Sequence, residues 1–104
     1  MELFMEAGKV LFVNLPKEID HHKVSKLATE IDWTMIEKAP EILVFDFSKV
    51  EFMDSSGIGL LIGRYRKMEC LGGTVCMRGV KGHMTKLIAL SGIEKYIRKY
   101  EGAK

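Results

Sequence analysis

The sequence has few cysteines, a balanced charge and no long apolar run, and therefore lacks the features that would indicate an oxidising compartment, nucleic-acid binding or a membrane. It has only two cysteines and two prolines among 104 residues, and 16 lysines and arginines stand against 14 aspartates and glutamates, for a formal net charge of +2. This balance does not favour electrostatic binding to nucleic acid or an anionic membrane. No apolar run approaches the ~20 residues of a membrane-spanning helix, and no signal peptide opens the chain. We therefore expect a cytoplasmic protein that binds neither nucleic acid nor a membrane.

The two cysteines, Cys70 and Cys76, are too few for the disulfide framework of a small secreted domain. Both lie beside apolar residues, and we interpret them as reduced thiols in or near the core. A chain of this length with 47% hydrophobic residues can bury one core of modest size. We expect a single domain over residues 1–104.

Apolar periodicity predicts strands and helices in alternation. The expected strands cover residues 2–5, 10–15, 42–47 and 74–77, with a short strand or extended segment at 93–97. The expected helices run from Asp20 to about residue 36, from the loop at 54–57 to the pair Gly72 and Gly73, and over 81–90. A strand–helix–strand order implies parallel strands. The fold class is therefore α/β, with helices packed on a mixed sheet of four to five strands.

Three residues of helix-capping type, Asp54, Ser55 and Ser56, precede the second helix. Their oxygens can accept hydrogen bonds from the free N–H groups at a helix N-terminus. The same end of a helix stabilises an anion, including a phosphate attached to a serine. The residues alone therefore allow two interpretations of Ser55 and Ser56, as a helix cap or as a site of phosphorylation.

The two serines lie in a longer pattern, Phe52-Met53-Asp54-Ser55-Ser56-Gly57-Ile58-Gly59-Leu60. Glu18-Ile19-Asp20-His21-His22 comes before it, and Gly63-Arg64-Tyr65 and Leu90-Ser91-Gly92-Ile93 come after it. Together these segments resemble the signature of the STAS-domain anti-sigma-factor antagonists. The match covers about residues 9–99 and implies a single STAS-like domain. Lys17 departs from the family, which often has a glycine there, and an end at Lys104 leaves the family's terminal helix short or missing.

In that family, of sporulation or stress type, the first serine after the aspartate is phosphorylated by a partner anti-sigma factor that is itself a kinase. By position this serine is Ser55. The resemblance implies a binding protein without catalytic residues or cofactor, which frees a sigma factor, is switched off by phosphorylation and is reset by a phosphatase. The implied partner-binding residues are Asp20, Asp54, Ser55, Ser56, Gly57, Ile58 and Gly59. For Asp20, a role as helix N-cap is a sufficient alternative.

Other site chemistries lack their sequence patterns. A metal site is disfavoured because no cysteine pair has zinc-ligand spacing and because neighbouring helical side chains diverge; the candidate ligands are His21, His22, Cys70, Cys76 and His83. No Gly-x-Ser-x-Gly motif of a hydrolase occurs. Two alternatives to the antagonist stay open: a STAS scaffold or ligand-sensing module whose serine is never phosphorylated, and a nucleotide-binding domain.

The glycines and basic residues of the second helix allow more than one interpretation. Gly57, Gly59 and Gly63 do not form a dinucleotide fingerprint, because their spacing is GxGxxxG. Gly59 and Gly63 would let the helix closely approach the sheet or a partner, and Gly57 would give a partner's active site room at Ser55. The expected outer side of the helix carries three cations, as a solvated face or as part of a docking surface: Arg64, Arg66 and Lys67.

Overall fold

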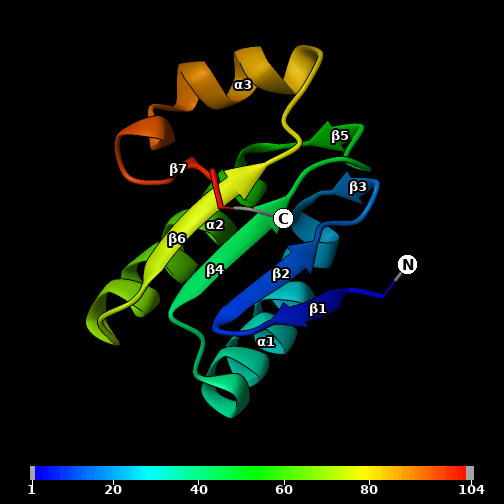
Figure 1. Cartoon of the computed structure of the whole chain (residues 1–104). Coiled ribbons are helices and arrows are strands. Elements are labelled where there is room, and N and C mark those ends of the chain that lie inside the picture. The colour runs from blue at the N-terminus through cyan, green and yellow to red at the C-terminus, as the bar shows by residue number, and fades with distance from the viewer. Residues whose placement is uncertain (1, 103–104) are drawn as a thin grey trace.

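A mixed, five-stranded sheet forms the centre of the protein, whose computed structural model describes residues 2–102 (Figure 1). The strands are β1 (Phe4–Ala7), β2 (Val10–Asn14), β4 (Ile42–Asp46), β6 (Thr74–Arg78) and β7 (Arg98–Lys99), in the order β1-β2-β4-β6-β7. β1 is antiparallel to β2, and the other neighbours are parallel. The predicted α/β class and the predicted parallel pairing are confirmed.

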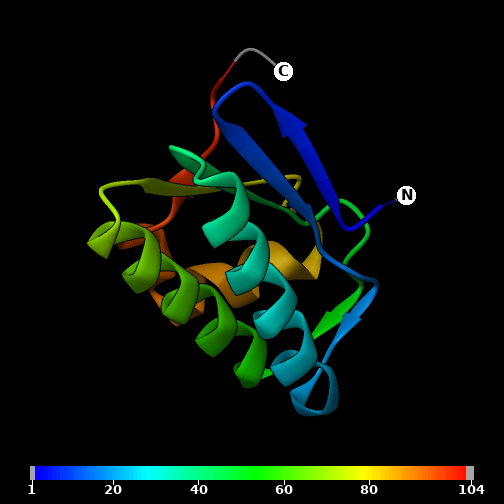
Figure 2. The same ribbon diagram turned by 90° about the horizontal axis from the view of Figure 1, so that it is seen from below.

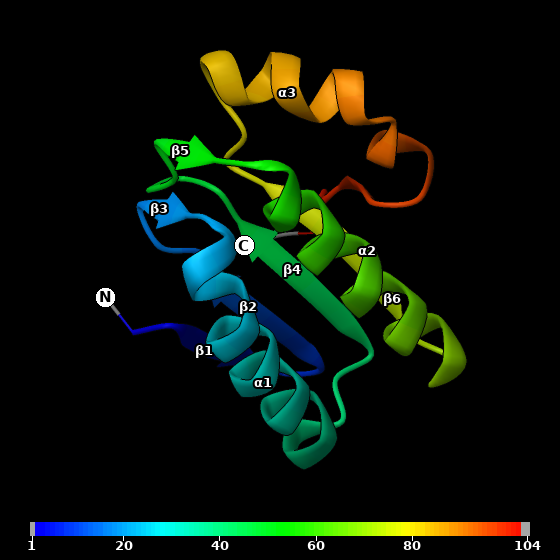
Figure 3. The same ribbon diagram turned by 180° about the vertical axis from the view of Figure 1, so that it is seen from behind.

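Two long helices cover one face of this sheet. α1 (His21–Lys38) precedes β4 and α2 (Ser55–Cys70) precedes β6. They lie side by side behind the sheet in Figure 1, in front of it in Figure 3, and next to each other from below in Figure 2. α3 (His83–Ser91) lies at the end of the sheet toward which β4 and β6 point (Figure 1). A helix thus lies between each two consecutive parallel strands of the main sheet, as a parallel crossover requires.

The core lies between the sheet and these helices. Alternate strand residues point into it, because successive side chains of a strand face opposite sides. The main sheet contributes Leu11, Val13, Leu43, Phe45, Val75 and Met77 to this core. From α1 come the buried Leu27, Ile31 and Met35, with Val24 and Ala28 at the margin, at the three-to-four spacing of one helix face. Trp33, which the sequence did not place, is exposed.

A second, parallel sheet of two very short strands was not predicted. It consists of β3 (Glu18–Ile19) and β5 (Phe52–Met53), and Ile19 pairs with Met53. Runs of two residues are too short to show a periodicity. The residues that follow the pair, Asp20 and Asp54, therefore stand at the same level, and each begins a helix.

The other face of the main sheet carries no helix within residues 2–102 (Figure 1). Its central residues Phe12 and Val44 are nevertheless almost fully buried. The Arg78 guanidinium lies 4.1 Å from the centroid of the Phe12 ring, and Tyr100 packs edge-on against the same ring. Side chains of β6 and of the segment after β7 thus shield this face.

Two local predictions are wrong. Residues 93–97 do not form a strand, because Gly92, at φ 78°, turns the chain into the short 3₁₀ helix η1 (Ile93–Lys95) before β7. Cys70 is not near the core but exposed in the last turn of α2, whereas Cys76 on β6 is partly buried. Within residues 2–102, no helix follows β7, and none of the helices is both long and apolar enough to cross a membrane.

Candidate functional site

The N-termini of α1 and α2 lie next to each other (Figure 3), because each helix begins directly after one strand of the paired β3 and β5. Asp20 is the N-cap of α1, and its side chain accepts hydrogen bonds from the backbone N–H groups of His22 at 3.0 Å and Lys23 at 3.2 Å. The predicted N-cap role of Asp20 is confirmed. Asp54 is the N-cap of α2 in the same way. Two capped helix starts therefore form one end of the molecule.

The Asp54 carboxylate joins these two helix starts. Its Oδ1 accepts hydrogen bonds from the backbone N–H of Ser56, at 2.9 Å, and from the Ser56 hydroxyl. Its Oδ2 accepts from the backbone N–H of His21 at 3.3 Å, and the His21 Nδ1 lies 3.8 Å from it. The pKa of Asp54 is lowered, chiefly because the Ser56 hydroxyl donates a hydrogen bond to the carboxylate. The backbone N–H groups of Ser56 and His21 lower it further. Asp54 is therefore ionised at neutral pH and already occupies the anion-binding position between the helices.

Ser55 is the first residue of α2 and is exposed. Its hydroxyl forms no hydrogen bond with any side chain or backbone group of residues 2–102. Ser56 is partly buried, and both its N–H and its hydroxyl are bound to Asp54. The cap of α2 is thus Asp54, and Ser55 is the serine whose hydroxyl is open to another protein.

The three residues after Ser56 have different environments. Gly57 is buried, and a Cβ there would overlap the Met53 side chain and lie 3.3 Å from Ile19, so its missing side chain lets α2 begin directly on the β3–β5 pair. Ile58 is partly buried at the margin of the core. Gly59 is exposed, and a Cβ there would meet no atom within 4 Å. Close approach to the sheet therefore does not explain Gly59.

The basic residues of α2 do not share one side of the helix. Arg64 was expected on the outer side, but only 9% of it is exposed, and its Nε lies 3.0 Å from Oδ1 of Asp32 on α1. Lys67 Nζ lies 2.9 Å from the other Asp32 oxygen. Asp32 therefore ties α2 to α1 through two cations. Arg66 is exposed and forms no ion pair within residues 2–102.

The three histidines are exposed, as expected for His21 and His22 in the first turn of α1. The rings of His21 and His22 lie 4.0 Å apart between centroids, and His83 Nε2 lies 2.8 Å from the backbone oxygen of Glu51. In the part of the chain that the structure describes, no three histidine, cysteine or acidic side chains group as ligands for a metal ion.

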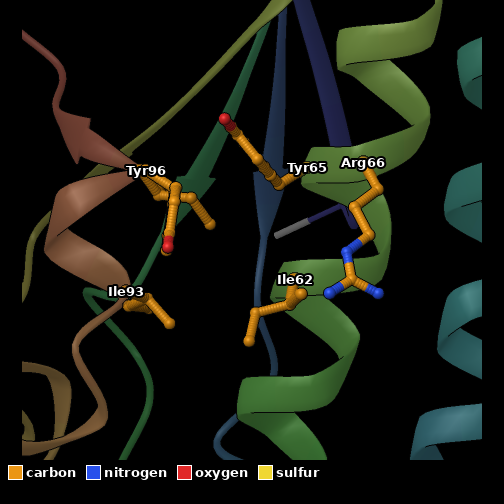
Figure 4. A pocket seen from close by; sticks show the side chains of 6 residues that line it. Ile62, Tyr65, Arg66, Ile93 and Tyr96 are labelled. Atoms are coloured by element: carbon orange, nitrogen blue, oxygen red, sulfur yellow. The ribbon is translucent and has the colours of Figure 1, made fainter.

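A groove between α2 and η1 was missed by sequence reasoning (Figure 4). It has a volume of about 210 Å³ and is lined by Ile62, Tyr65, Arg66, Ile93, Tyr96 and Ile97. The rings of Tyr65 and Tyr96 lie 5.5 Å apart between centroids. Tyr96 meets Tyr65 only because η1 turns the chain back, which no sequence pattern showed.

Comparison with known proteins agrees with this geometry. The STAS domain family matches residues 5–103. The chain is 32% identical over 92 residues to the anti-sigma F factor antagonist of Paenibacillus polymyxa and 28% identical to that of Lysinibacillus sphaericus, in each case over 88% of this chain and 79% of the relative.

Solved structures show the same likeness. The anti-sigma factor antagonist SpoIIAA in its unphosphorylated form superimposes with a TM-score of 0.80 at 25% identity, over 94% of this chain and 86% of that one. The Bacillus cell fate determinant SpoIIAA in its phosphorylated form gives a TM-score of 0.71 at 28% identity, over 94% and 91%. Because the family matches nearly the whole length of this chain, the chain belongs to the STAS domain family.

Proposed function

We propose that the protein is an anti-sigma-factor antagonist, a cytoplasmic binding module with no catalytic activity of its own. In the unphosphorylated state, the surface around Ser55 binds an anti-sigma factor, which then releases its sigma factor. That anti-sigma factor is also a serine kinase. It transfers the γ-phosphoryl group of Mg-ATP to the Ser55 oxygen, with ADP as the leaving group and the hydroxyl proton passing to a base of the kinase. A phosphatase that hydrolyses the phosphoserine resets the switch.

The observation that carries this proposal is the free, exposed hydroxyl of Ser55 at the first position of α2. Because Asp54 caps the helix, modification of Ser55 removes no hydrogen bond of the fold. The names of the two relatives and the solved phosphorylated form of a similar protein support the same function. The proposed partner surface consists of Asp20, Asp54, Ser55, Ser56, Ile58 and Gly59. Gly57, which the sequence placed with these residues, is buried against Met53 and Ile19 and does not face the partner.

Phosphorylation acts in this proposal by changing the charge of the surface. A phosphate adds about 1.5 to 2 negative charges at neutral pH, next to the Asp54 carboxylate. Because Asp54 already accepts the N–H groups of Ser56 and His21, these donors are not free to neutralise the phosphate. The new charge is left facing the partner, where it opposes binding by desolvation and repulsion. A loss of about 1.4 kcal/mol in binding free energy lowers the affinity tenfold.

The test is intact-mass spectrometry after incubation with Mg-ATP and the candidate anti-sigma kinase from the same genome. The wild type is compared with Ser55→Ala and with Ser56→Ala as the matched control. We expect one phosphate on the wild type and on Ser56→Ala, and none on Ser55→Ala.

Each other outcome points to a different function or site. Addition to Ser55→Ala but not to Ser56→Ala would move the site to Ser56. No addition to any variant, by a kinase shown to be active, would favour the scaffold or ligand-sensing module. Affinity for ATP by this protein alone, without mass gain, would favour the nucleotide-binding domain.

A further inference from the structure

The outward face of α2 carries a continuous stripe of residues from Ser55 to the groove. At about 100° per residue, three further residues fall within one narrow sector with Ser55, on the side opposite the buried residues Leu60, Arg64 and Met68. This α2 stripe consists of Ser55, Gly59, Ile62 and Arg66. At 1.5 Å per residue it is roughly 16 Å long. Ile62 and Arg66, at its far end, line the groove (Figure 4).

No contact or backbone angle among the described residues requires glycine along this face. Gly59 lies on the α2 stripe and Gly63 beside it, and neither has the positive φ that would require glycine. A Cβ at either position would meet no atom within 4 Å. Glycine weakens a helix interior relative to alanine, so two of them on one face need a reason. The missing side chains leave a shallow channel along which another backbone can lie close to α2.

The groove at the end of the channel suits a protruding side chain of a protein better than a small molecule. Its floor includes Ile93 and Ile97, which are 1% and 0% exposed, and its walls are two tyrosine rings. Its volume of about 210 Å³ is below the roughly 300–1,000 Å³ of small-molecule pockets. Arg66 is the one charged residue among those that line it, and it has no ion-pair partner within residues 2–102. The complementary ligand is an aliphatic side chain with a carboxylate beside it.

We propose that the anti-sigma factor bound at Ser55 also places a segment of its chain along the α2 stripe, with an aliphatic side chain in the groove and a carboxylate against Arg66. This inference rests on the proposed function, and it adds a second contact roughly 16 Å from the phosphorylated residue. The groove contact is made equally before and during phosphoryl transfer. It therefore sets the affinity of the complex and not the rate of the chemical step.

The experiment measures binding of the unphosphorylated protein to the anti-sigma kinase from the same genome by titration calorimetry. Tyr96→Ala and Arg66→Glu alter the groove at exposed residues. Their matched controls are Trp33→Ala, another exposed aromatic residue, and Lys26→Glu, another exposed cation. We expect Kd to rise at least about tenfold for the two groove variants and to stay within about twofold for the controls. Single-turnover phosphorylation of Ser55 at saturating protein should keep its wild-type rate.

The outcomes separate this inference from the function on which it rests. Groove variants that bind like the wild type, while Ser55 still takes the phosphate, would overturn the groove contact and leave the antagonist function standing. Equal weakening by Trp33→Ala and Lys26→Glu would also overturn it, because the effect would not be specific to the groove. A wild type that neither binds nor is phosphorylated by an active kinase would remove the proposed function itself.

Discussion

The carboxylate of Asp54, at the start of α2, accepts a hydrogen bond from the backbone N–H of His21, at the start of α1, over 3.3 Å. Residues 33 positions apart thereby fix two helix N-termini relative to each other. The same carboxylate caps α2 through Ser56. The exposed surface at Ser55 thus depends on one acidic side chain that belongs to both helix starts.

The hydrogen bonds of Asp54 predict how the free energy of unfolding changes with pH. The pKa of Asp54 lies below its ordinary value of 3.8, chiefly because of the hydrogen bond from the Ser56 side chain. A depressed folded-state pKa means that Asp54 contributes stability above pH 3.8, which is lost as the pH falls through the lower folded-state pKa. Asp54→Asn keeps a capping oxygen but has no charge to titrate. Urea denaturation between about pH 5 and pH 2 should show a shallower loss for Asp54→Asn than for the wild type; equal slopes would contradict the assignment.

Ser55→Ala should leave the fold almost unchanged, because the Ser55 hydroxyl is exposed and does not cap α2. We expect its free energy of unfolding to stay within about 0.5 kcal/mol of the wild type. Asp20→Ala, which removes the cap of α1, should cost about 1 kcal/mol. Urea denaturation of the two variants in parallel checks this. A loss at Ser55 as large as that at Asp20 would mean that the serine has a structural role.

The pair of Arg64 and Asp32 should be important for joining α1 to α2. Arg64 Nε lies 3.0 Å from Asp32 Oδ1, but the N–H does not point at the oxygen, so this buried contact is an ion pair without a hydrogen bond. Asp32→Ala leaves the guanidinium without its counter-ion, and we expect a loss of about 1–3 kcal/mol in unfolding free energy. Arg64→Leu together with Asp32→Ala should recover much of that loss, because no buried charge is left unpaired. A double variant less stable than Asp32→Ala would contradict this account.

The features that the sequence predicted correctly are local ones. Helical spacing of apolar residues predicts α1, and Asp20 is its N-cap because its oxygen suits the free N–H groups of the turn that follows. For α2 the sequence left Asp54, Ser55 and Ser56 as candidate caps, and the structure uses Asp54. The alternation of strands and helices then requires parallel pairing. Each of these depends on residues a few positions apart, which is the range that periodicity and capping patterns cover.

The features that the sequence did not show depend on contacts between distant elements. Charge placed Arg64 on the outside, but Asp32 on another helix provides a counter-ion that lets it be buried. The β3–β5 pair is too short to carry a pattern, although it brings the two helix starts together. The groove needs the turn at η1 to bring Tyr96 to Tyr65. Such pairings follow from tertiary packing and not from local preference.

The two cysteines should differ in reactivity. Cys70 is exposed, whereas Cys76 is partly buried, and burial raises the pKa of the Cys76 thiol. Because the thiolate is the reactive form, the lower accessibility of Cys76 and its higher pKa both slow its alkylation. We expect iodoacetamide to modify Cys70 at least about tenfold faster in the native protein, and the two rates to converge in urea. Intact-mass time courses of Cys70→Ser and Cys76→Ser measure each thiol separately; equal native rates would contradict the placement of Cys70.

Gly59→Ala should stabilise the free protein and weaken its complex. The position is an exposed helix interior with open space for a methyl group, so we expect a gain of about 0.5–1 kcal/mol in unfolding free energy. In the proposed complex, the same methyl group would lie between α2 and the backbone of the anti-sigma factor, so Kd should rise, and it should rise further for Gly59→Leu. Thr29→Ala, at an exposed position of α1, is the control that should leave Kd unchanged. Opposite signs for stability and affinity cannot come from damage to the fold, whereas a stabilised Gly59→Ala with wild-type Kd would show that this glycine does not face the partner.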